Sequence, residues 1–312
     1  MDPSTSVIIP AYNEEGSLRE VTERVLKMLS EYNLSGEIII VDDGSTDRTG
    51  VLADELAQAN PILKAVHHNR PLGKTAAISV GIRKARGAIF AIIDADLQYS
   101  PEDLPKLLEP ILANEYDLVN GWRVTRSDPR TRILASRIYN WLVRRFFHTD
   151  IQDNNSGLKT IKREVMKTVM PQLRRDFHRY LIPLAHHYGY RLAEVPICHN
   201  PRKGGHPKYS SLIRLITGPV DMITLKLVLT FEDNPATLFG IPGAIMAVAG
   251  TTVGIYLVLL RFIFDEPLSR HLSLSALAVV LIMSGTLFFM MGFLANMVAA
   301  IRAEIREIVR SR

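Results

Sequence analysis

The chain has 312 residues, of which 47% are apolar, and its formal net charge is +5. This length and this apolar fraction are sufficient for a substantial core in one large or two ordinary domains. The positive charge is modest, and we expect no nucleic-acid partner. Cys198 is the only cysteine, which excludes an intrachain disulfide and a cysteine-based metal cluster.

Short runs rich in valine and isoleucine alternate with helical patterns in the first part of the chain. We expect the first helix to begin near Asn13, which is a good N-cap, and further helices after Asp47 and Lys74. The alternation predicts an α/β fold, a mostly parallel sheet with helices on both faces. The predicted strands are 6–10, 37–42, 63–67, 88–94, 116–121 and 190–197.

The last part of the chain is far more apolar. Residues 239–260 and 272–301 contain no charged side chain, and each run exceeds the roughly 20 residues with which a helix crosses a bilayer. Soluble core helices rarely stay uncharged on every face over such lengths. We therefore predict a two-helix transmembrane hairpin, with spans at about 236–262 and 272–301.

A mixed apolar and charged segment, 207–233, precedes this hairpin. We interpret it as one or two amphipathic helices in the membrane interface, broken near Gly218 and Pro219. An ordinary packing helix is an equal alternative. The segment separates a soluble domain, 1–206, from the membrane part, 234–312.

Basic residues flank the predicted hairpin on both sides, with Lys203, Arg214 and Lys226 before it and four arginines after Ile301. By the positive-inside rule both flanks are cytoplasmic, so the tail and the soluble domain face the cytoplasm. We therefore expect a multi-pass protein of the plasma membrane.

Polar clusters follow the predicted strands, where ligands bind in an open parallel sheet. The turn after the first strand lacks the glycines of a dinucleotide fold, and a phosphate loop at Gly73-Lys74-Thr75 would need a glycine where His68 stands. Asp94 and Asp96 follow the strand 88–94. Because unpaired buried charge is costly, such a pair needs a cation, and Mg²⁺ or Mn²⁺ bridging to a diphosphate suits it. A capped turn with solvated carboxylates is the alternative.

Four blocks together resemble the family 2 glycosyltransferases of GT-A fold. They are Val7 to Glu15, Val41 to Asp47, Gly73-Lys74, and Asp94-Ala95-Asp96-Leu97-Gln98. The resemblance implies that a metal ion, Mg²⁺ or Mn²⁺, is held by Asp94, Asp96 and Gln98, with Asp96 also catalytic. It implies that the nucleotide-sugar is bound by Pro10, Ala11, Tyr12, Glu14, Asp42, Gly73, Lys74, Asp94 and Ala95.

Later blocks resemble more narrowly the polyprenyl-phosphate glycosyltransferases. Gly121-Trp122-Arg123 is similar to a Gly-x-Arg motif of that group, 132–136 to its acceptor segment, and Asp153 to Lys159 to its Asp-x-x-Ser-Gly block. This resemblance implies that Arg123 and Asp153 belong to the catalytic machinery. It implies that the lipid phosphate is bound by Arg123, Arg132, Ser136, Arg202 and Lys208.

The expected reaction is a single inverting displacement that gives a polyprenyl-phosphate sugar. Guanidinium groups would offset the repulsion between the lipid phosphate and the nucleotide diphosphate. No general base is assigned, since a phosphate monoester is mostly dianionic at neutral pH, its second pKa being about 6. The nucleotide, UDP or GDP, and the polyprenol, undecaprenyl or dolichyl, stay open. The two-span layout is similar to that of two-span members of this glycosyltransferase group. This similarity suggests a homo-oligomer.

Two other functions compete with this interpretation. A polysaccharide-extending synthase of the same fold usually carries a Gln-x-x-Arg-Trp motif, whereas here Asp176 follows Gln172 to Arg175. A membrane scaffold that binds anionic lipids without catalysis leaves the four ordered blocks unexplained.

Overall fold

The computed structural model describes residues 4–125, 130–172, 177–201, 211–233 and 235–310. It divides into two compact units, Met1–Ser211 and Leu212–Arg312. The first unit contains every described strand, and the second is built of long helices.

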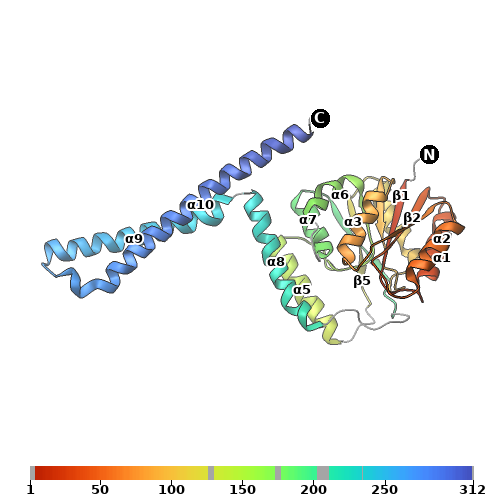
Figure 1. The fold of residues 1–312 in the computed structure, drawn as a ribbon, viewed down its shortest axis with the longest axis horizontal. Coiled ribbons are helices and arrows are strands. Elements are labelled where there is room, and N and C mark those ends of the chain that lie inside the picture. Colours follow the sequence, from red (N-terminus) through yellow and green to blue (C-terminus); the bar gives the residue numbers. More distant parts are fainter. Residues whose placement is uncertain (1–3, 126–129, 173–176, 202–210, 234, 311–312) are drawn as a thin grey trace. The chain divides into compact units, whose positions relative to one another are not determined.

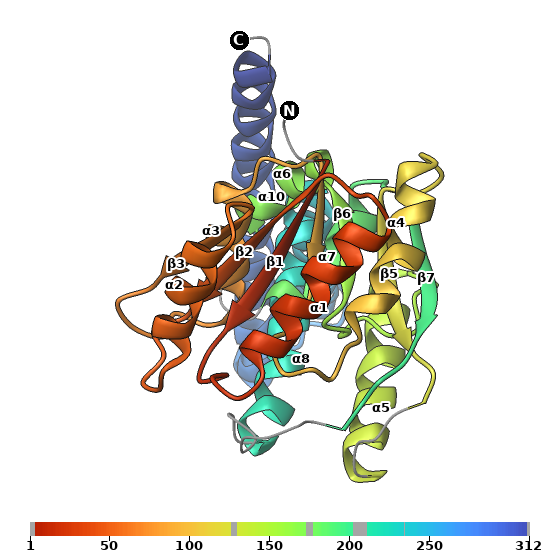
Figure 2. The ribbon, with the colours of Figure 1, turned by 90° about the vertical axis from the view of Figure 1, so that its right-hand side faces the viewer.

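Seven strands of the first unit (Figure 1) form one mixed sheet in the order β3-β2-β1-β4-β6-β5-β7, which can be followed from β3 to β7 in Figure 2. Strands β1 to β4 are mutually parallel, β6 is antiparallel to both β4 and β5, and β7 is parallel to β5. All strands except β6 therefore end at the same edge of the sheet. The bounds are β1 Thr5–Ala11, β2 Gly36–Asp42, β3 Leu63–His67, β4 Ile89–Ile92, β5 Leu118–Arg123, β6 Lys159–Lys162 and β7 Leu192–Ile197.

Helices cover both faces of this sheet, as predicted. On one face, α1 (Leu18–Glu31), α2 (Thr49–Ala59) and α4 (Leu104–Leu112) contribute to a single apolar cluster with the strands (Figure 2). On the other, α3 (Lys74–Lys84) packs so closely that a Cβ on Gly81 would lie 2.6 Å from Ile8. Helices α6 (Arg163–Val169) and α7 (Leu181–His187) line a cavity together with α3, while α5 (Arg130–Phe147) packs against α7.

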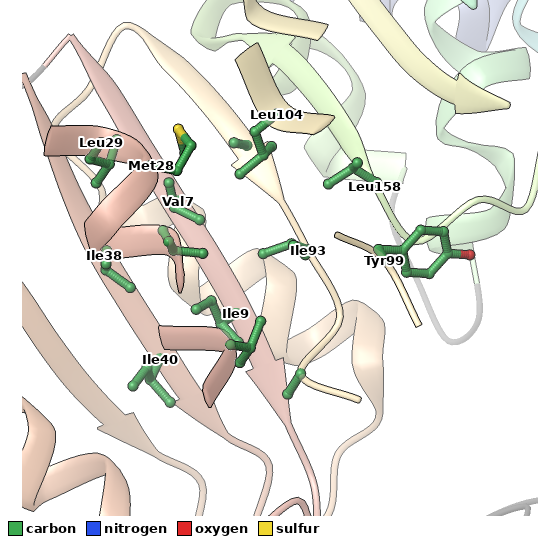
Figure 3. Packing of buried hydrophobic residues seen from close by; sticks show 14 of the residues in the cluster. Val7, Ile9, Met28, Leu29, Ile38, Ile40, Ile93, Tyr99, Leu104 and Leu158 are labelled. Atoms are coloured by element: carbon green, nitrogen blue, oxygen red, sulfur yellow. The ribbon is translucent and has the colours of Figure 1, made fainter. Parts of the chain in front are cut away.

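The period-2 pattern of the central strands explains the core. Val7 and Ile9 of β1 point to the α1 face with Ile38 and Ile40 of β2, whereas Ile8 lies on the α3 face. Figure 3 shows the first set packed beside Met28 and Leu29 of α1. Because these strands are buried on both faces, they read as continuous apolar runs rather than as alternating ones.

The start of the first helix was predicted wrongly. Asn13 does not cap a helix but adopts a positive φ of 52°, and α1 begins only at Leu18. Asparagine tolerates this left-handed conformation better than most residues. The chain therefore turns at Asn13 before it enters the helix.

The second unit consists of α8 (Ser211–Asp233), α9 (Pro235–Ile263) and α10 (Leu272–Arg310). The predicted break at Gly218 and Pro219 is wrong, because α8 is continuous across both residues. Proline removes one backbone hydrogen bond, but its fixed φ suits a helix, and α9 likewise contains Pro242.

Helices α9 and α10 provide two candidate membrane spans, Ala236–Ile263 and, with the turn before α10, Leu268–Ile301. Only 17% of the most apolar window of each span is buried, whereas a soluble core helix would be mostly buried. The two helices pack through small residues, since a Cβ on Gly243 would lie 2.5 Å from the Phe289 nitrogen. The predicted layout of an α/β domain followed by an apolar helical hairpin is confirmed.

Candidate active site

The predicted functional residues gather at one edge of the sheet because their strands end there. Ala11 closes β1, Asp42 closes β2, and Asp94 follows β4. Since β6 runs opposite to its two neighbours, β5 is parallel to β4 and brings Arg123 to the same edge. The first residue of β6, Lys159, lies at this edge as well.

Two loops at this edge are tied to each other by hydrogen bonds. The backbone amide of Asn13 donates to Ser45 Oγ at 2.9 Å, and that of Glu14 donates to Thr49 Oγ1 at 2.8 Å. In return, the Thr46 amide donates to Asn13 Oδ1 at 2.8 Å. The loop that carries the predicted donor residues Tyr12 and Glu14 is thus fixed against the loop after β2. Pro10 and Ala11 lie at the end of β1, directly before that loop.

Asp42 is buried, and both of its carboxylate oxygens have partners. Oδ1 accepts a hydrogen bond from the Ser45 amide at 3.0 Å, and Oδ2 lies 3.2 Å from His67 Nδ1. The other ring nitrogen of His67 lies 3.0 Å from Asp54. Burial alone would lower the pKa of His67, but the hydrogen bonds with Asp42 and Asp54 outweigh it and raise the pKa above its usual value.

Asp43 organises the segment that leads into α3. Its carboxylate accepts hydrogen bonds from the amides of Leu72 at 2.9 Å and Gly73 at 2.8 Å, and it lies 2.7 Å from His68 Nδ1. Gly73 has a positive φ of 93°, which glycine adopts without strain. These contacts set the position of Lys74. Asp43 had no assigned role in the sequence prediction, although it stands inside one of the four blocks.

Lys74 meets the Asp-x-Asp segment directly, with Nζ 2.5 Å from Asp94 Oδ1. Asp96 Oδ1 accepts a hydrogen bond from the Gln98 amide at 3.2 Å, which closes a tight turn. Leu97 in that turn is buried and has a positive φ of 59°, a conformation unfavourable for a side chain of this type. Strain of this kind accumulates at functional sites, where the surrounding structure holds it in place.

Asp94 and Asp96 could supply two carboxylates to a divalent cation whose other ligands would come from a substrate. Among the described residues, no three His, Cys, Asp or Glu side chains are grouped so that they could hold a metal ion. Mg²⁺ is commonly bound by one or two carboxylates together with substrate phosphates. The ammonium of Lys74 already occupies a cation position beside Asp94. Both carboxyl groups are partly exposed, and so is Gln98, the third predicted ligand.

Arg123 and Asp153 form a bidentate ion pair. Arg123 Nε donates to Asp153 Oδ2 at 2.6 Å, and Nη2 donates to Oδ1 at 2.8 Å. Both side chains are buried, with 8% and 5% of their surfaces exposed. Breaking such a pair is costly, so Asp153 fixes the guanidinium at the edge of the sheet. The structure thus pairs two residues that come from different sequence blocks.

Gly157 brings the loop after Asp153 against the Asp-x-Asp segment. A Cβ at this position would strike Asp94 Oδ2 and lie 2.6 Å from Tyr99 Cε2. Only glycine therefore allows the two segments to approach this closely.

The remaining predicted acceptor residues are described only in part. Ser136 is half-buried on α5. Arg132 stands in the first turn of α5, but its side chain is outside the described part of the chain, and Arg202 and Lys208 lie outside the described residues. Their assignment stays a prediction.

Three residues of this region had no role in the sequence prediction, namely Asn120, Lys159 and Glu194. Asn120 lies in β5 and Glu194 in β7, and neither belongs to a block that resembles the family. Lys159 was noticed only as the last residue of such a block. These three residues are identified in the structure by the hydrogen bonds among their polar groups. The sequence does not indicate these hydrogen bonds.

Known proteins resemble this chain in sequence and in fold. Residues 6–170 match the family model "Glycosyl transferase family 2". The chain is 31% identical over 302 residues to undecaprenyl-phosphate 4-deoxy-4-formamido-L-arabinose transferase of Pseudomonas aeruginosa (strain LESB58), covering 96% of this chain and 86% of that protein. It is 32% identical over 305 residues to the transferase of the same name from Pectobacterium atrosepticum. This match covers 97% of this chain and 90% of that protein.

Solved structures show the same fold at lower identity. Mannosyl-3-phosphoglycerate synthase from Rubrobacter xylanophilus has a TM-score of 0.54 at 18% identity, over 72% of this chain and 74% of that one. Glucosyl-3-phosphoglycerate synthase from Mycobacterium tuberculosis, in complex with Mn²⁺ and UDP-glucose, has a TM-score of 0.51 at 22% identity, over 72% and 79%.

The fold, the site and these relatives together define a glycosyltransferase. The chain belongs to glycosyl transferase family 2, within its polyprenyl-phosphate glycosyltransferase group. The family predicted from the sequence blocks is confirmed.

Proposed function

We propose that this protein transfers a sugar from a nucleotide-sugar to polyprenyl monophosphate at the membrane surface. The observation that carries the proposal is the buried Arg123–Asp153 pair at the same sheet edge as the Asp94–Lys74 pair. The relatives of similar length carry undecaprenyl phosphate in their names, which supports this lipid as the acceptor.

On the donor side, the loops after β1 and β2 would hold the nucleoside. Asp42 is oriented there by Ser45 and His67. Lys74 and the metal held by Asp94, Asp96 and Gln98 would face the diphosphate. When bound, that metal ion supplies positive charge to the departing diphosphate. Lys74 adds a second positive charge at the same place.

On the acceptor side, Arg123 would hold the lipid phosphate. A guanidinium held by a carboxylate at a fixed position is pre-organised for an anion. A phosphate oxygen of the lipid then forms a bond to the anomeric carbon, while the bond from that carbon to the nucleotide phosphate breaks. The bonding electrons leave with the nucleoside diphosphate. Because the phosphate is already ionised at neutral pH, no side chain has to remove a proton.

The membrane orientation is also part of the proposal. We propose that α9 and α10 span the bilayer and that the sheet domain faces the cytoplasm. The basic residues around the two spans support this orientation through the positive-inside rule. Cysteine-reactive labelling of intact cells tests it, with one variant that carries a cysteine in the turn between the spans and one that carries it after Arg310. Reagent outside the cell should label only the first.

The activity test uses purified protein in detergent or vesicles. UDP- and GDP-linked sugars are offered with undecaprenyl phosphate or with undecaprenol, and the glycolipid is detected by mass. We expect product only with the phosphate and one class of donor. Equal activity on the alcohol would exclude a phosphate acceptor, and product on neither lipid, with growth of a sugar chain instead, would favour a polysaccharide synthase.

The role of Arg123 is tested by Arg123→Lys. Lysine keeps the charge but lacks the planar guanidinium, which can donate hydrogen bonds to Asp153 and to a phosphate at the same time. Transfer should therefore fall about tenfold to hundredfold. Arg86→Lys is the control, because Arg86 is exposed at the opposite end of the strands. Unimpaired transfer by Arg123→Lys would show that the lipid phosphate is bound elsewhere, with Arg132, Arg202 and Lys208 as the next variants to measure.

A further inference from the structure

Lys159 is a buried lysine that the proposed reaction does not use. It is the first residue of β6, which lies between β4 and β5, and only 5% of its surface is exposed. Asp94 follows β4, and Arg123 ends β5. Burying an ammonium group is costly unless hydrogen bonds compensate for the lost water. Its contacts therefore show which parts of the site depend on it.

The ammonium of Lys159 donates two short hydrogen bonds. One goes to Asn120 Oδ1 at 2.7 Å, and the other goes to the carbonyl oxygen of Ser156 at 2.6 Å. The first contact fixes the amide of Asn120, because its oxygen must face the lysine and its nitrogen must face away. Lys159 thus decides which way the donor group of Asn120 points.

The amide nitrogen of Asn120 acts on Asp153. Nδ2 donates to the Asp153 carbonyl oxygen at 2.7 Å and lies 3.2 Å from Glu194 Oε1. Glu194 in turn accepts hydrogen bonds from the amides of Asp153 at 2.8 Å and Gln152 at 2.7 Å. The backbone of Asp153 is therefore held on both sides, and its carboxylate is directed at Arg123.

The bond to Ser156 anchors the other end of the same loop. Ser156 precedes Gly157, which lies against Asp94 and Tyr99. The loop 153–158 thus runs from the Arg123 pair to the Asp94 segment. Lys159 contacts this loop directly at Ser156 and, through Asn120, at Asp153. Lys159 also lines a small cavity of about 20 Å³ together with Lys74 of the donor side.

The charges on both sides of the site act on Lys159. Burial lowers the pKa of Lys159 to about 7, Asp153 and Asp94 oppose this shift, and Lys74 and Arg123 reinforce it. The loop is therefore built around an amino group whose pKa is affected by charged residues on both the donor side and the acceptor side.

We propose that Lys159 is a positioning residue for the acceptor phosphate, acting through Asn120 and Asp153 on the guanidinium of Arg123. This inference rests on the proposed function, in which Arg123 binds the lipid phosphate. Without the lysine, the side-chain amide of Asn120 can flip and exchange the positions of its oxygen and nitrogen. The carboxylate of Asp153 then no longer fixes the guanidinium of Arg123. Binding of the lipid should then weaken more than binding of the nucleotide-sugar.

The test compares Lys159→Met with Lys162→Met in the full-length protein. Lys162 is a matched control because it lies in the same strand and also donates two hydrogen bonds, to Asn114 and Asp117, away from the site. Thermal unfolding confirms that each variant is folded. For Lys159→Met we expect KM for undecaprenyl phosphate to rise about tenfold or more, with KM for the nucleotide-sugar changed less than about threefold.

Two further variants test whether Lys159 acts on Arg123 through Asn120 and Asp153. Asn120→Ala should raise KM for the lipid in the same way, and the double variant with Lys159→Met should be no worse than the stronger single variant. Lys159→Arg, which keeps the charge and the donors, should restore part of the affinity for the lipid. Should Lys159→Met not fold, Asn120→Ala alone carries the test.

The outcomes separate this inference from the proposed function. Wild-type protein that makes no glycolipid from undecaprenyl phosphate overturns the proposed function itself. With an active wild type, the inference is overturned if Lys159→Met behaves like Lys162→Met. It is also overturned if KM rises equally for both substrates, or if the effects of Lys159→Met and Asn120→Ala are additive.

Discussion

Asp96 is the residue on which the proposed donor chemistry depends most directly. It stands with Asp94 at the end of β4, in a turn strained at Leu97. Asp96→Ala removes one of two carboxylates for a shared cation, so we expect transfer to fall at least about a hundredfold. A chelator should inhibit wild-type protein similarly, and added Mg²⁺ or Mn²⁺ should restore it. Asp150→Ala, at an exposed position, is the control, and substantial activity of Asp96→Ala would remove the metal from the mechanism.

Gly157 allows its loop to approach Asp94 and Tyr99 more closely than any residue with a side chain would permit. A Cβ there would collide with the carboxylate of Asp94 and the ring of Tyr99. We expect Gly157→Ala to abolish detectable transfer and to lower the unfolding temperature, because backbone and ring must both move. Gly16→Ala is the matched control, since a Cβ at Gly16 meets nothing within 4 Å. Activity within about twofold of wild type in Gly157→Ala would contradict the assigned packing.

Glu37 makes the stability of the first unit depend on pH. Burial alone would raise the pKa of Glu37, but hydrogen bonds from Lys64, the Arg86 amide and Ser6 lower it from 4.5 to about 2. The folded state therefore binds this proton more weakly than the unfolded state. Its contribution is fully present above pH 4.5 and is lost as the pH falls toward 2.

Unfolding temperatures measured between pH 2 and 6 check this expectation. Wild type should lose stability over that range more steeply than Glu37→Gln, whose side chain does not titrate. Parallel curves for the two proteins would show that Glu37 is not the group responsible.

At the scale of the elements, the strands that carry the donor site were predictable because they are apolar runs that alternate with helical patterns. Strand β6 was missed. Its sequence, Lys-Thr-Ile-Lys, has no apolar run, and it is a strand only because β4 and β5 pair with it on both sides. The metal and donor residues were therefore located from motifs, whereas the Lys159 network depends on a strand that only tertiary pairing creates.

The predicted break in α8 failed for a related reason. Gly218 and Pro219 both disfavour a helix locally, yet α8 continues through them. Local propensity is a weak guide where neighbouring turns on both sides are helical. The positive φ of Asn13 is a second case, since hydrogen bonds from another loop hold that turn.

Helix α5 presents an exposed apolar stripe formed by Leu134, Ile138 and Trp141, which are 60%, 53% and 57% exposed. Exposed arginines 137, 144 and 145 lie on the same helix. Such a combination favours contact with an anionic bilayer surface, and tryptophan prefers this interface. We expect Trp141 to lie at the level of the lipid headgroups.

Fluorescence can measure this position because Trp122 and Trp141 are the only tryptophans. The variant Trp122→Phe, reconstituted in vesicles with brominated lipids, should lose most of its emission. The complementary variant Trp141→Phe should be quenched far less. Equal emission of Trp122→Phe in brominated and ordinary lipids would show that α5 stands clear of the bilayer.

At the scale of the whole molecule, the hairpin depends on glycines where α9 and α10 meet. A Cβ on Gly243 would lie 2.7 Å from the Gly285 carbonyl oxygen, and one on Gly285 would lie 2.5 Å from the Ala247 nitrogen. We expect Gly243→Leu or Gly285→Leu to force the helices apart and to lower the unfolding temperature in detergent. Gly254→Leu, where a Cβ meets nothing within 4 Å, should leave it unchanged. Equal temperatures for all three variants would contradict this helix packing.

The order of the elements along the chain has a consequence for biosynthesis. Among the described residues, the seven strands of the sheet precede α9 and α10. Strand β7, which lies beside β5, ends at Ile197, and α9 begins at Pro235. Because domains tend to fold as units while the chain is still being made, the N-terminal part first, we expect the sheet to acquire its last strand before α9 and α10 leave the ribosome. We therefore expect the sheet unit to be folded before α9 and α10 can insert into a bilayer.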